Sequence, residues 1–460
     1  MAEPSVLYRA AWVLPMATKP IENGCVIVTG DRIDFVGSYH DAPRHANVVD
    51  LGDAAIMPGL VNVHTHLELT AMRHALEGLD FFEWIRTLTR IRKEVLSSSG
   101  DVRASARVGI AEGLTRGITT YADTASMGAS VLEGLRDMQV RGIVYQESFG
   151  PDPDPFTTVE PAIRRLRQQV AEMRGRQTEM VRVGISPHAP YSVSVPLYKT
   201  IGTWAAQQKL PVAVHLAESE AEHRFVKRGD GPFADYWRER NLDPAASKAR
   251  SPVSLLEQSY ILRLKPLVIH AVHIDAEDAY TLARHGCQIA HCPVSNARFG
   301  HGIAPWVLWR EHTLNVAIGT DSVAANNRMD VLGEARIAQL LTAGYERNAG
   351  LMGAATALKM ATLNGAAALG IPEQAGAILP GYQADLSVWS LDAWSARPVR
   401  DPYDVILHGL AGSEARMTMV AGEVLWLDGR HLAYRRRDED RGRIDRLGRQ
   451  LMEARVTCPI

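Results

Sequence analysis

Eight short apolar runs alternate with helical stretches through the middle of this 460-residue chain, and this alternation restricts the fold more than any other feature. Such runs are typical of buried strands, and the stretches between them carry the apolar spacing of helices. Strands that alternate with helices pair in parallel, and eight such units across roughly 250–300 residues predict a (β/α)8 barrel. The predicted strands are Ile56–His66, Ile118–Thr124, Gly142–Ser148, Val181–Ser186, Pro211–His215, Leu267–Ile274, Cys287–Pro293 and Asn315–Thr320.

Both ends of the chain have a different pattern, which predicts short strands separated by turns. Gly24–Val28 and Ile33–Gly37 are clear examples near the start, and Ala384–Trp389 and Met417–Trp426 are their counterparts near the end. A chain of this length exceeds one compact core, so a small β-sandwich built from both termini is expected beside the barrel. The predicted boundaries are 1–57 and 376–430 for the sandwich, 58–375 for the barrel and 431–460 for a helical tail.

Composition excludes several classes of protein. A net charge of −2 gives no electrostatic footprint for nucleic acid or for an acidic membrane surface. The four cysteines form no paired framework, which fits a reducing compartment. The N-terminus lacks the basic flank and apolar core of a signal peptide, and no uncharged stretch approaches the roughly 20 residues of a membrane span. A cytoplasmic enzyme with a small-molecule substrate is therefore expected.

Three of the apolar runs end in the side chains predicted to bind a metal. His64 and His66 lie two apart and so point the same way from one strand, while His215 and Asp321 end the fifth and eighth strands. A (β/α)8 barrel gathers the carboxyl ends of its strands at one rim, where its chemistry takes place. Three imidazoles and a carboxylate suit Zn²⁺ or Fe²⁺, and a site that activates water keeps one position open. One hydrolytic metal site is predicted from these four ligands.

Three further side chains at the same rim are candidates for catalysis or substrate binding. Glu218 follows His215 by three residues, where a carboxylate can take a proton from the attacking water and return it to a leaving or ring nitrogen. His270 directly follows the sixth apolar run and is a better inward candidate than His273; it would polarise the nucleophile or stabilise the tetrahedral intermediate. The fourth strand lacks the lysine that would bridge two metals, so a mononuclear centre is favoured and His188 becomes a substrate-holding candidate.

The run Pro58–His66 resembles the first-strand signature of the amidohydrolase superfamily, and the chain as a whole is similar to its mononuclear deaminase and chlorohydrolase branch. The motifs that carry this resemblance are Pro187–Tyr191, His215–Glu218, His270–His273, Ser295-Asn296, Gly302–Pro305 and Gly319–Ser322 with Asn326-Asn327. The branch includes guanine, methylthioadenosine/S-adenosylhomocysteine and aminodeoxyfutalosine deaminases and the triazine hydrolases. The resemblance implies hydrolytic deamination, in which zinc-bound hydroxide attacks an amidine carbon, Glu218 moves protons and ammonia leaves. It also implies dimers, although no residue here marks an interface.

The resemblance identifies the substrate less specifically than it identifies the reaction. The chain is similar to the methylthioadenosine/S-adenosylhomocysteine enzymes, but Gln146 and Glu147 stand where those enzymes hold a carboxylate with an arginine. Leu67-Glu68-Leu69 is more similar to the relatives of aminodeoxyfutalosine deaminase. The resemblance to adenosine-type enzymes implies that an acid near Glu94 binds the ribose hydroxyls. In this chain Trp84 is predicted either to stack on a base or to anchor its helix. His188 and Ser322 fall in substrate-binding motifs.

The prediction is therefore a zinc-dependent deaminase of a purine-type amine, most similar to enzymes of 5′-modified adenosines. A triazine-type chlorohydrolase or a cyclic amide hydrolase on the same metal site is the alternative, and retention of both Glu218 and His270 favours deamination. A non-catalytic scaffold on this fold would be expected to lack ligands, and none is missing. The longest loop-like stretch, Lys227–Pro252, is predicted to be either a lid over the site or a plain surface connection.

Overall fold

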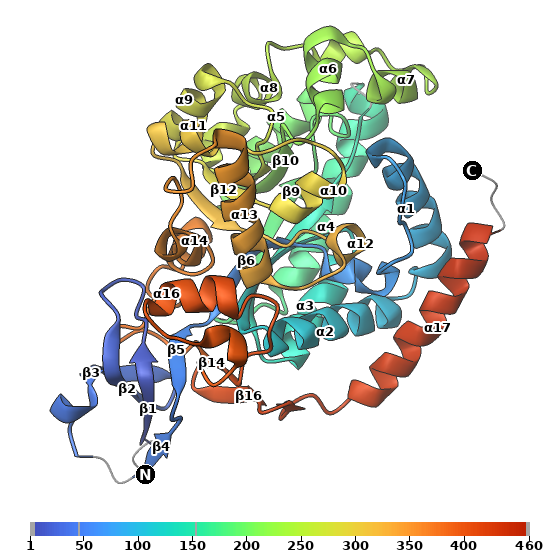
Figure 1. Cartoon of the computed structure of the whole chain (residues 1–460). Helices are drawn as coiled ribbons and strands as arrows, with labels where there is room; N and C mark the ends of the chain where they lie inside the picture. The colour runs from blue at the N-terminus through green and yellow to red at the C-terminus, as the bar shows by residue number, and fades with distance from the viewer. Residues whose placement is uncertain (1–4, 45–46, 152–153, 457–460) are drawn as a thin grey trace.

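The computed structural model describes residues 5–44, 47–151 and 154–456 of the chain. Strands from both ends form one hydrogen-bonded path beside the barrel, at the lower left of Figure 1. The N-terminal strands are β1 (Ser5–Val13), β2 (Ile21–Thr29), β3 (Arg32–Ser38), β4 (Val48–Asp50) and β5 (Ala54–Pro58). The C-terminal strands are β14 (Leu386–Ser390), β15 (Met417–Val420), β16 (Glu423–Leu427) and β17 (Arg430–His431), and β14 pairs antiparallel with β5.

A common core holds the two groups of terminal strands together. Val26, Val28 and Ile56 from the N-terminal strands share it with Val388 and Met417 from the C-terminal strands. Residues two apart on a strand face the same side of the sheet, so Val26 and Val28 both point into this core. The predicted β-sandwich domain from both termini is confirmed.

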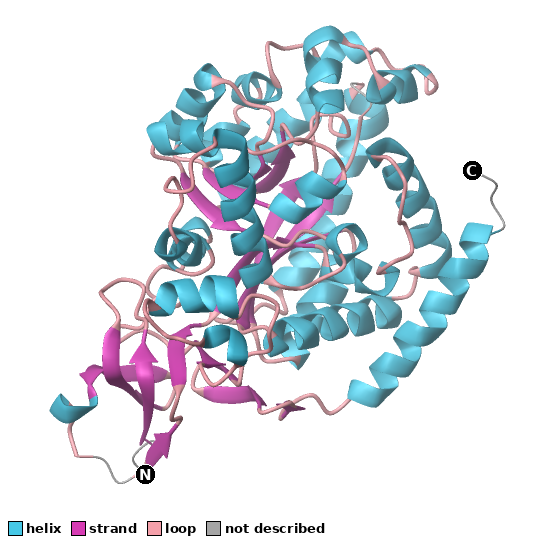
Figure 2. Cartoon of the chain, viewed as in Figure 1, coloured by secondary structure: helices cyan, strands magenta, loops and turns pink. Residues whose placement is uncertain are grey.

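The predicted (β/α)8 barrel is also confirmed, with its strands at the centre and helices around them (Figure 2). Four parallel strands form its first half: β6 (Leu60–Thr65), β7 (Ile118–Ala125), β8 (Arg141–Ser148) and β9 (Val181–Pro187). The second half consists of β10 (Ala213–Leu216), β11 (Leu267–His270), β12 (Gln288–His291) and β13 (Asn315–Ile318). Backbone bonds join the halves, from His215 N to His188 O at one seam and from Asp321 N to His64 O at the other, each 2.9 Å long.

Helices follow the strands in the expected order. Between the first strands lie α1 (Phe81–Val95), α2 (Ser99–Thr115), α3 (Gly128–Asp137), α4 (Glu160–Arg174) and α5 (Val195–Gln208). The second half carries α6 (Glu220–Arg228), α7 (Pro232–Arg238), α8 (Pro252–Gln258), α9 (Ala276–His285), α10 (Pro293–Arg298), α11 (Trp306–Glu311), α12 (Val323–Asn326) and α13 (Val331–Glu346). Then come α14 (Ala354–Met360), α15 (Leu363–Ala368), α16 (Pro402–Asp404) and the long α17 (Arg437–Val456), which lies along α1 and α2 (Figure 1).

Two expectations about elements need correction. The predicted strand Ile56–His66 is two strands in two sheets, β5 and β6, because the chain changes sheets at Pro58-Gly59. Gly59 is required there, since a Cβ would lie 2.2 Å from Thr119 Oγ1. The loop-like stretch Lys227–Pro252 contains α7, and Pro232 stands in the first turn of that helix, where proline is favoured.

The described chain provides no disulfide and no membrane helix. Cys25, Cys287 and Cys292 are buried free thiols, and Cys458 lies outside the described residues. Among the residues that the structure describes, no helix is long and apolar enough to cross a membrane.

Candidate active site

His64, His66 and Asp321 converge at one rim of the barrel. His64 is on β6 and His66 follows its end, while Asp321 follows β13 and turns out of the sheet with a φ of +59°. This left-handed conformation is uncommon for a residue other than glycine, and such strain concentrates at functional sites. Asp321 Oδ1 lies 3.3 Å from His64 Nε2 and 3.6 Å from His66 Nε2. The predicted ligands from the first and last strands therefore face each other across the barrel seam.

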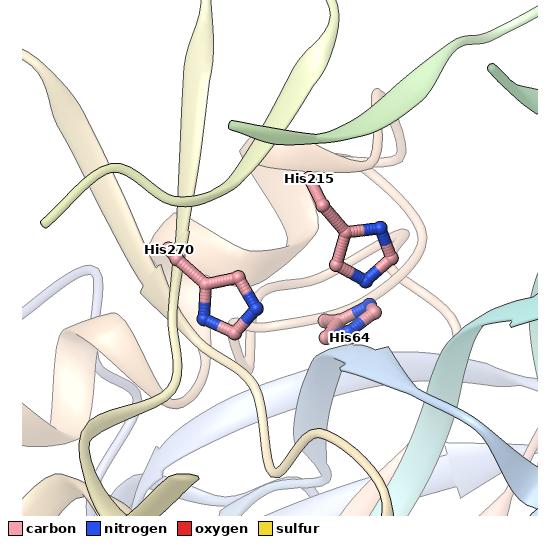
Figure 3. Close-up of side chains that lie close together, drawn as sticks. All are labelled: His64, His215 and His270. Carbon is pink, nitrogen blue, oxygen red and sulfur yellow. The ribbon is translucent and has the colours of Figure 1, made fainter. Parts of the chain in front are cut away.

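His215 and His270 complete the cluster, as Figure 3 shows for their rings and that of His64. The ring centroid of His64 lies 4.9 Å from that of His215 and 6.0 Å from that of His270. His66 stacks on His215 with the centroids 5.5 Å apart. His270 thus lies beside the predicted ligands, and the structure brings together all five side chains.

His270 faces the site, as the sequence predicted, but it does so through a break in strand alternation. Leu267 and Ile269 belong to the core that fills the barrel, so regular alternation would turn His270 away from it. The strand instead ends at His270, which has a φ of +75°, and Ala271 follows with a φ of +50°. The chain leaves the β conformation at this residue, which brings the imidazole to the rim.

Hydrogen bonds from neighbouring groups fix the orientation of the ligand side chains. His215 Nδ1 lies 3.3 Å from the carbonyl oxygen of His188, which leaves Nε2 for a metal. Ser295 Oγ donates to Asp321 Oδ2 at 2.6 Å, and the backbone N–H of Ser322 donates to Oδ1 at 2.7 Å. Thr124 Oγ1 contacts the ring of His66 at 3.2 Å. Such outer contacts set ring tautomer and ligand basicity in metal sites.

The protonation states at neutral pH are those that metal binding needs. Burial lowers the pKa of His64 to about 4, with only partial compensation from Asp321. Burial and neighbouring imidazoles lower the pKa of His215 well below its ordinary value. Burial alone would raise the pKa of Asp321, but His64 and the neighbouring histidines hold it far below its usual range. Neutral imidazoles and an ionised carboxylate are the forms that bind metals.

The cluster fits a divalent metal ion. Zinc bonds of about 2.0–2.1 Å in tetrahedral geometry place ligand atoms about 3.3 Å apart, as the Asp321 contacts already are. His64 Nε2 is buried and has no hydrogen-bond partner among the described residues, which is costly for a polar atom unless an ion binds it. His64, His66, His215 and Asp321 would hold the metal, and His270 Nε2 stands beside them.

Glu218 is held at the edge of this cluster by two kinds of contact. The buried carboxylate of Glu222 accepts hydrogen bonds from the backbone N–H groups of Ala217 and Glu218, both at 2.9 Å, and so fixes the turn after β10. Glu218 Oε1 itself lies 3.5 Å from His270 Nε2 and 3.4 Å from His301 Nε2. Burial acts to raise the pKa of Glu218, but His270 and His301 outweigh it and lower the pKa. An ionised, buried carboxylate beside the ligands is suited to accept a proton.

A large pocket opens above the cluster. It has a volume of about 1340 Å³, and the metal-binding rim forms its floor together with Glu218 and His270. Its walls are α1 and the α7 region, which contribute aromatic side chains: Phe81, Phe82, Trp84, Phe233, Tyr236 and, from other segments, Tyr191, Phe149 and Phe299. Tyr191 and Phe233 stack with centroids 3.9 Å apart. The segment Lys227–Pro252 is therefore part of the pocket wall.

Two predicted substrate residues lie on the floor of this pocket. His188 Nδ1 is 2.7 Å from Ser192 Oγ, which leaves Nε2 to face a substrate. Glu147 Oε2 accepts a hydrogen bond of 2.7 Å from Ser126 Oγ. Burial raises the pKa of Glu147, but His188 and His66 together with the Ser126 hydrogen bond outweigh it, so that the pKa is lowered. The floor thus presents one imidazole and one ionised carboxylate beside the metal ligands.

The other predicted substrate residues are placed differently. Trp84 lines the pocket but is largely buried against Phe299, with ring centroids 5.0 Å apart, so it anchors α1. Glu94 lies on the outer wall of the pocket, where its side chain is half-exposed and pairs with Arg90 at 3.8 Å. Gln146 turns away from the pocket, since its amide bonds the backbone of Gly128, Ser126 and Glu147. Ser322 caps α12 by accepting a hydrogen bond from Ala324 N, so neither of these last two reaches a substrate.

Several contributing residues carried no local signal in the sequence. The buried carboxylate of Glu68 pairs with Arg92 of α1 at 2.7 Å, and the same Arg92 nitrogen contacts Ser126 Oγ at 3.0 Å. This pair ties the helical wall to the rim of the barrel. Ser295 and Asn296 stood in a motif without an assigned role, and His301 lay in a glycine-flanked loop. Covariation between homologues would be the signal for such long-range pairs.

Comparison with known proteins agrees with this architecture. The amidohydrolase family profile matches residues 55–425 of the chain. A 5-methylthioadenosine/S-adenosylhomocysteine deaminase from Nitratidesulfovibrio vulgaris is 32% identical over 443 residues, which cover 93% of each chain. The crystal structure of a zinc-bound adenosine deaminase from Xanthomonas campestris superposes with a TM-score of 0.83 at 25% identity, over 96% of this chain and 98% of that one. A zinc complex of an atrazine chlorohydrolase from Arthrobacter aurescens has the same fold, with a TM-score of 0.82 at 23% identity over 96% of this chain and 100% of that one.

Proposed function

The chain belongs to the amidohydrolase family, and we propose that it is a zinc-dependent hydrolytic deaminase of a purine-type amine, with a 5′-modified adenosine such as methylthioadenosine or aminodeoxyfutalosine as substrate. Membership of the family makes the chain a hydrolytic enzyme acting on C–N bonds. The observation that carries the deaminase proposal is the ionised Glu218 carboxylate, held beside four metal-competent ligands and below a pocket large enough for a nucleoside.

Each residue has a defined part in the proposed reaction, in which a C–O bond forms and the C–N bond to the amino group breaks. A bound Zn²⁺ would supply a water of lowered pKa as the nucleophile. Glu218 accepts a proton from that water and passes it to the purine, so that the amino group leaves as ammonia. His270 Nε2 hydrogen-bonds the attacking oxygen, and His188 Nε2 holds the ring. The curated deaminase at 32% identity supports this assignment.

The pocket favours a nucleoside over a compact ring. Small-molecule sites usually occupy about 300–1,000 Å³, and this pocket, at about 1340 Å³, exceeds that range. Aromatic side chains along α1 and α7 provide flat apolar contacts for a base and its substituent. Glu147 provides an acceptor for a hydroxyl or N–H group and would repel a substrate carboxylate placed beside it. We therefore expect methylthioadenosine to be a better substrate than S-adenosylhomocysteine.

The alternative is displacement of chloride or an alkylamine from a triazine, and the shared fold with the atrazine chlorohydrolase supports it. Chloride leaves without a proton, whereas ammonia or an alkylamine requires one, so a proton carrier at Glu218 favours release of an amine over release of chloride. A cytoplasmic location and a homodimer stay predictions.

The deciding experiment measures ammonia release by the zinc-reconstituted enzyme. The panel consists of adenosine, methylthioadenosine, S-adenosylhomocysteine, aminodeoxyfutalosine, guanine and a chlorotriazine, the last assayed for chloride. Ammonia from one of the adenosine nucleosides is expected, with kcat lowered about 100- to 10,000-fold in Glu218→Gln, because that variant keeps the shape but cannot move protons. No ammonia from any amine, with zinc bound, would overturn the proposal, and chloride release would establish the alternative.

A further inference from the structure

One short segment, residues 295–301, contacts three groups of the active site at once. Ser295 Oγ donates to Asp321 Oδ2 at 2.6 Å, and Asn296 Oδ1 lies 2.9 Å from His270 Nδ1. His301 Nε2 lies 3.4 Å from Glu218 Oε1. A backbone hydrogen bond from His301 N to Asn296 O, 2.9 Å long, closes the segment into a compact turn. The two ends of the segment are therefore fixed relative to each other.

His301 is buried and has a single polar contact for its Nε2 atom. Its side chain is 4% exposed, its Nε2 atom has no hydrogen-bond partner among the described residues, and Glu218 Oε1 lies 3.4 Å from that atom. Its ring packs edge-on against Phe81 of α1, with centroids 4.5 Å apart, and lies 5.5 Å from that of Phe299. A separation of 3.4 Å is long for a hydrogen bond, as such contacts often are before a substrate binds. Packing thus directs the imidazole at Glu218.

The tautomer of His270 explains why Glu218 needs a second histidine. Asn296 offers its carbonyl oxygen to His270 Nδ1, so that nitrogen carries the proton and the neutral ring has only a lone pair at Nε2. A lone pair cannot donate a hydrogen bond to Glu218 Oε1, 3.5 Å away, so in this neutral form His270 does not hold the carboxylate in place. The Nε2–H of His301 is a donor that can reach Oε1, since the two atoms lie 3.4 Å apart.

We infer that His301 is a positioning residue for Glu218: it donates a hydrogen bond to Oε1 and so holds the carboxylate that carries protons in the reaction. This inference rests on the proposed function for the role of Glu218, and on geometry alone for the contact. His301 does not line the pocket, so it acts through Glu218 and touches no substrate.

Three substitutions separate a hydrogen-bond role from a packing role. His301→Gln places an amide N–H where Nε2 was, His301→Asn carries the same amide one methylene short, and His301→Phe keeps a flat ring against Phe81 without any donor. We expect Gln to retain kcat within about threefold, while Asn and Phe lose about 10- to 100-fold, the effect of removing one hydrogen bond to a charged group. KM and zinc content should stay near the wild-type values in all three.

The reverse order would overturn the inference. If His301→Phe retains wild-type kcat, or if His301→Gln is as slow as His301→Phe, the ring acts by packing alone. Crystal structures of the zinc-loaded variants decide the same point without turnover: the Glu218 carboxylate should keep its place in His301→Gln and leave it in His301→Phe. An unmoved carboxylate in both variants would refute the positioning role. A wild-type enzyme that releases no ammonia would instead count against the proposed function.

Discussion

Removal of the Ser295 hydroxyl should weaken metal binding without unfolding the protein. Ser295 Oγ donates to Asp321 Oδ2 at 2.6 Å, a short contact to an ionised acceptor, and the side chain is fully buried. The other oxygen of that carboxylate, Asp321 Oδ1, faces His64 and His66. In Ser295→Ala the carboxylate loses the contact that directs Oδ1 at the metal, while the backbone bond from Ser322 N remains.

The size of the effect follows from the charge on the acceptor. Hydrogen bonds to charged groups contribute about 1.5–3 kcal/mol, and each 1.4 kcal/mol is a factor of ten in affinity. We therefore expect the Kd for Zn²⁺ to rise about 10- to 100-fold, in the range seen when contacts behind a metal ligand are removed. Competition with a chromophoric chelator measures this Kd directly.

Ser322→Ala is the matched control, because Ser322 is the other serine beside Asp321. Its hydroxyl accepts from Ala324 N and caps α12, so its loss should cost about 1 kcal/mol of unfolding free energy with the Kd for Zn²⁺ unchanged. Equal Kd values for Ser295→Ala and the wild type, or an equal loss in both variants, would refute the reasoning.

Further predictions concern the C-terminal helix, acid stability and metal removal. Asp440→Ala breaks a buried bidentate pair with Arg107, 2.7 Å at each nitrogen, and should cost about 1.5–3 kcal/mol in urea unfolding, because Arg107 keeps its contact with Asp137 at 2.8 Å; a loss below about 1 kcal/mol would contradict this. Burial lowers the pKa of His291 to about 3, so the unfolded chain binds more protons and stability falls as pH drops from about 6.5 towards 3. In the metal-free His291→Gln variant, the urea midpoint should fall less between pH 7 and 4 than in the metal-free wild type. An equal fall in both proteins would refute this assignment to His291. Chelation should abolish activity and lower Tm, and added Zn²⁺ should raise Tm with its concentration; a Tm insensitive to zinc would contradict the site.

The metal ligands could be predicted from the sequence because their placement follows from local rules. His64 and His66 share a strand face, and parallel strands end at one rim, so His215 and Asp321 had to meet them once the barrel was recognised. The same rules predicted Glu218, which lies in the turn directly after its strand. None of these inferences required knowledge of how distant segments pack.

The residues that hold the ligands in place were beyond such rules. His270 was predicted to face the site, but it reaches the site by leaving the β conformation at φ +75°, which strand periodicity does not encode. The pairs Glu68–Arg92 and Ser295–Asp321 and the contact of His301 with Glu218 join segments that are 24, 26 and 83 residues apart. No spacing in the sequence distinguishes such pairs from ordinary loop residues, because packing of the whole barrel brings them together.

The two sides of the pocket are built from different parts of the fold, and this bears on specificity. Barrel strands and the turns that follow them hold the metal ligands, Glu218 and His270, where backbone hydrogen bonds restrict movement. The substrate walls come from α1 and α7, helices inserted between strands, and α1 is braced from outside by α17. Substitutions at wall positions that do not contact the rim should alter which group is accepted and leave the chemistry intact, because function resides in the site and not in the fold. Substrate range should therefore respond to substitution of Phe82 and Tyr236, which line the pocket, whereas metal content and the dependence on Glu218 should not.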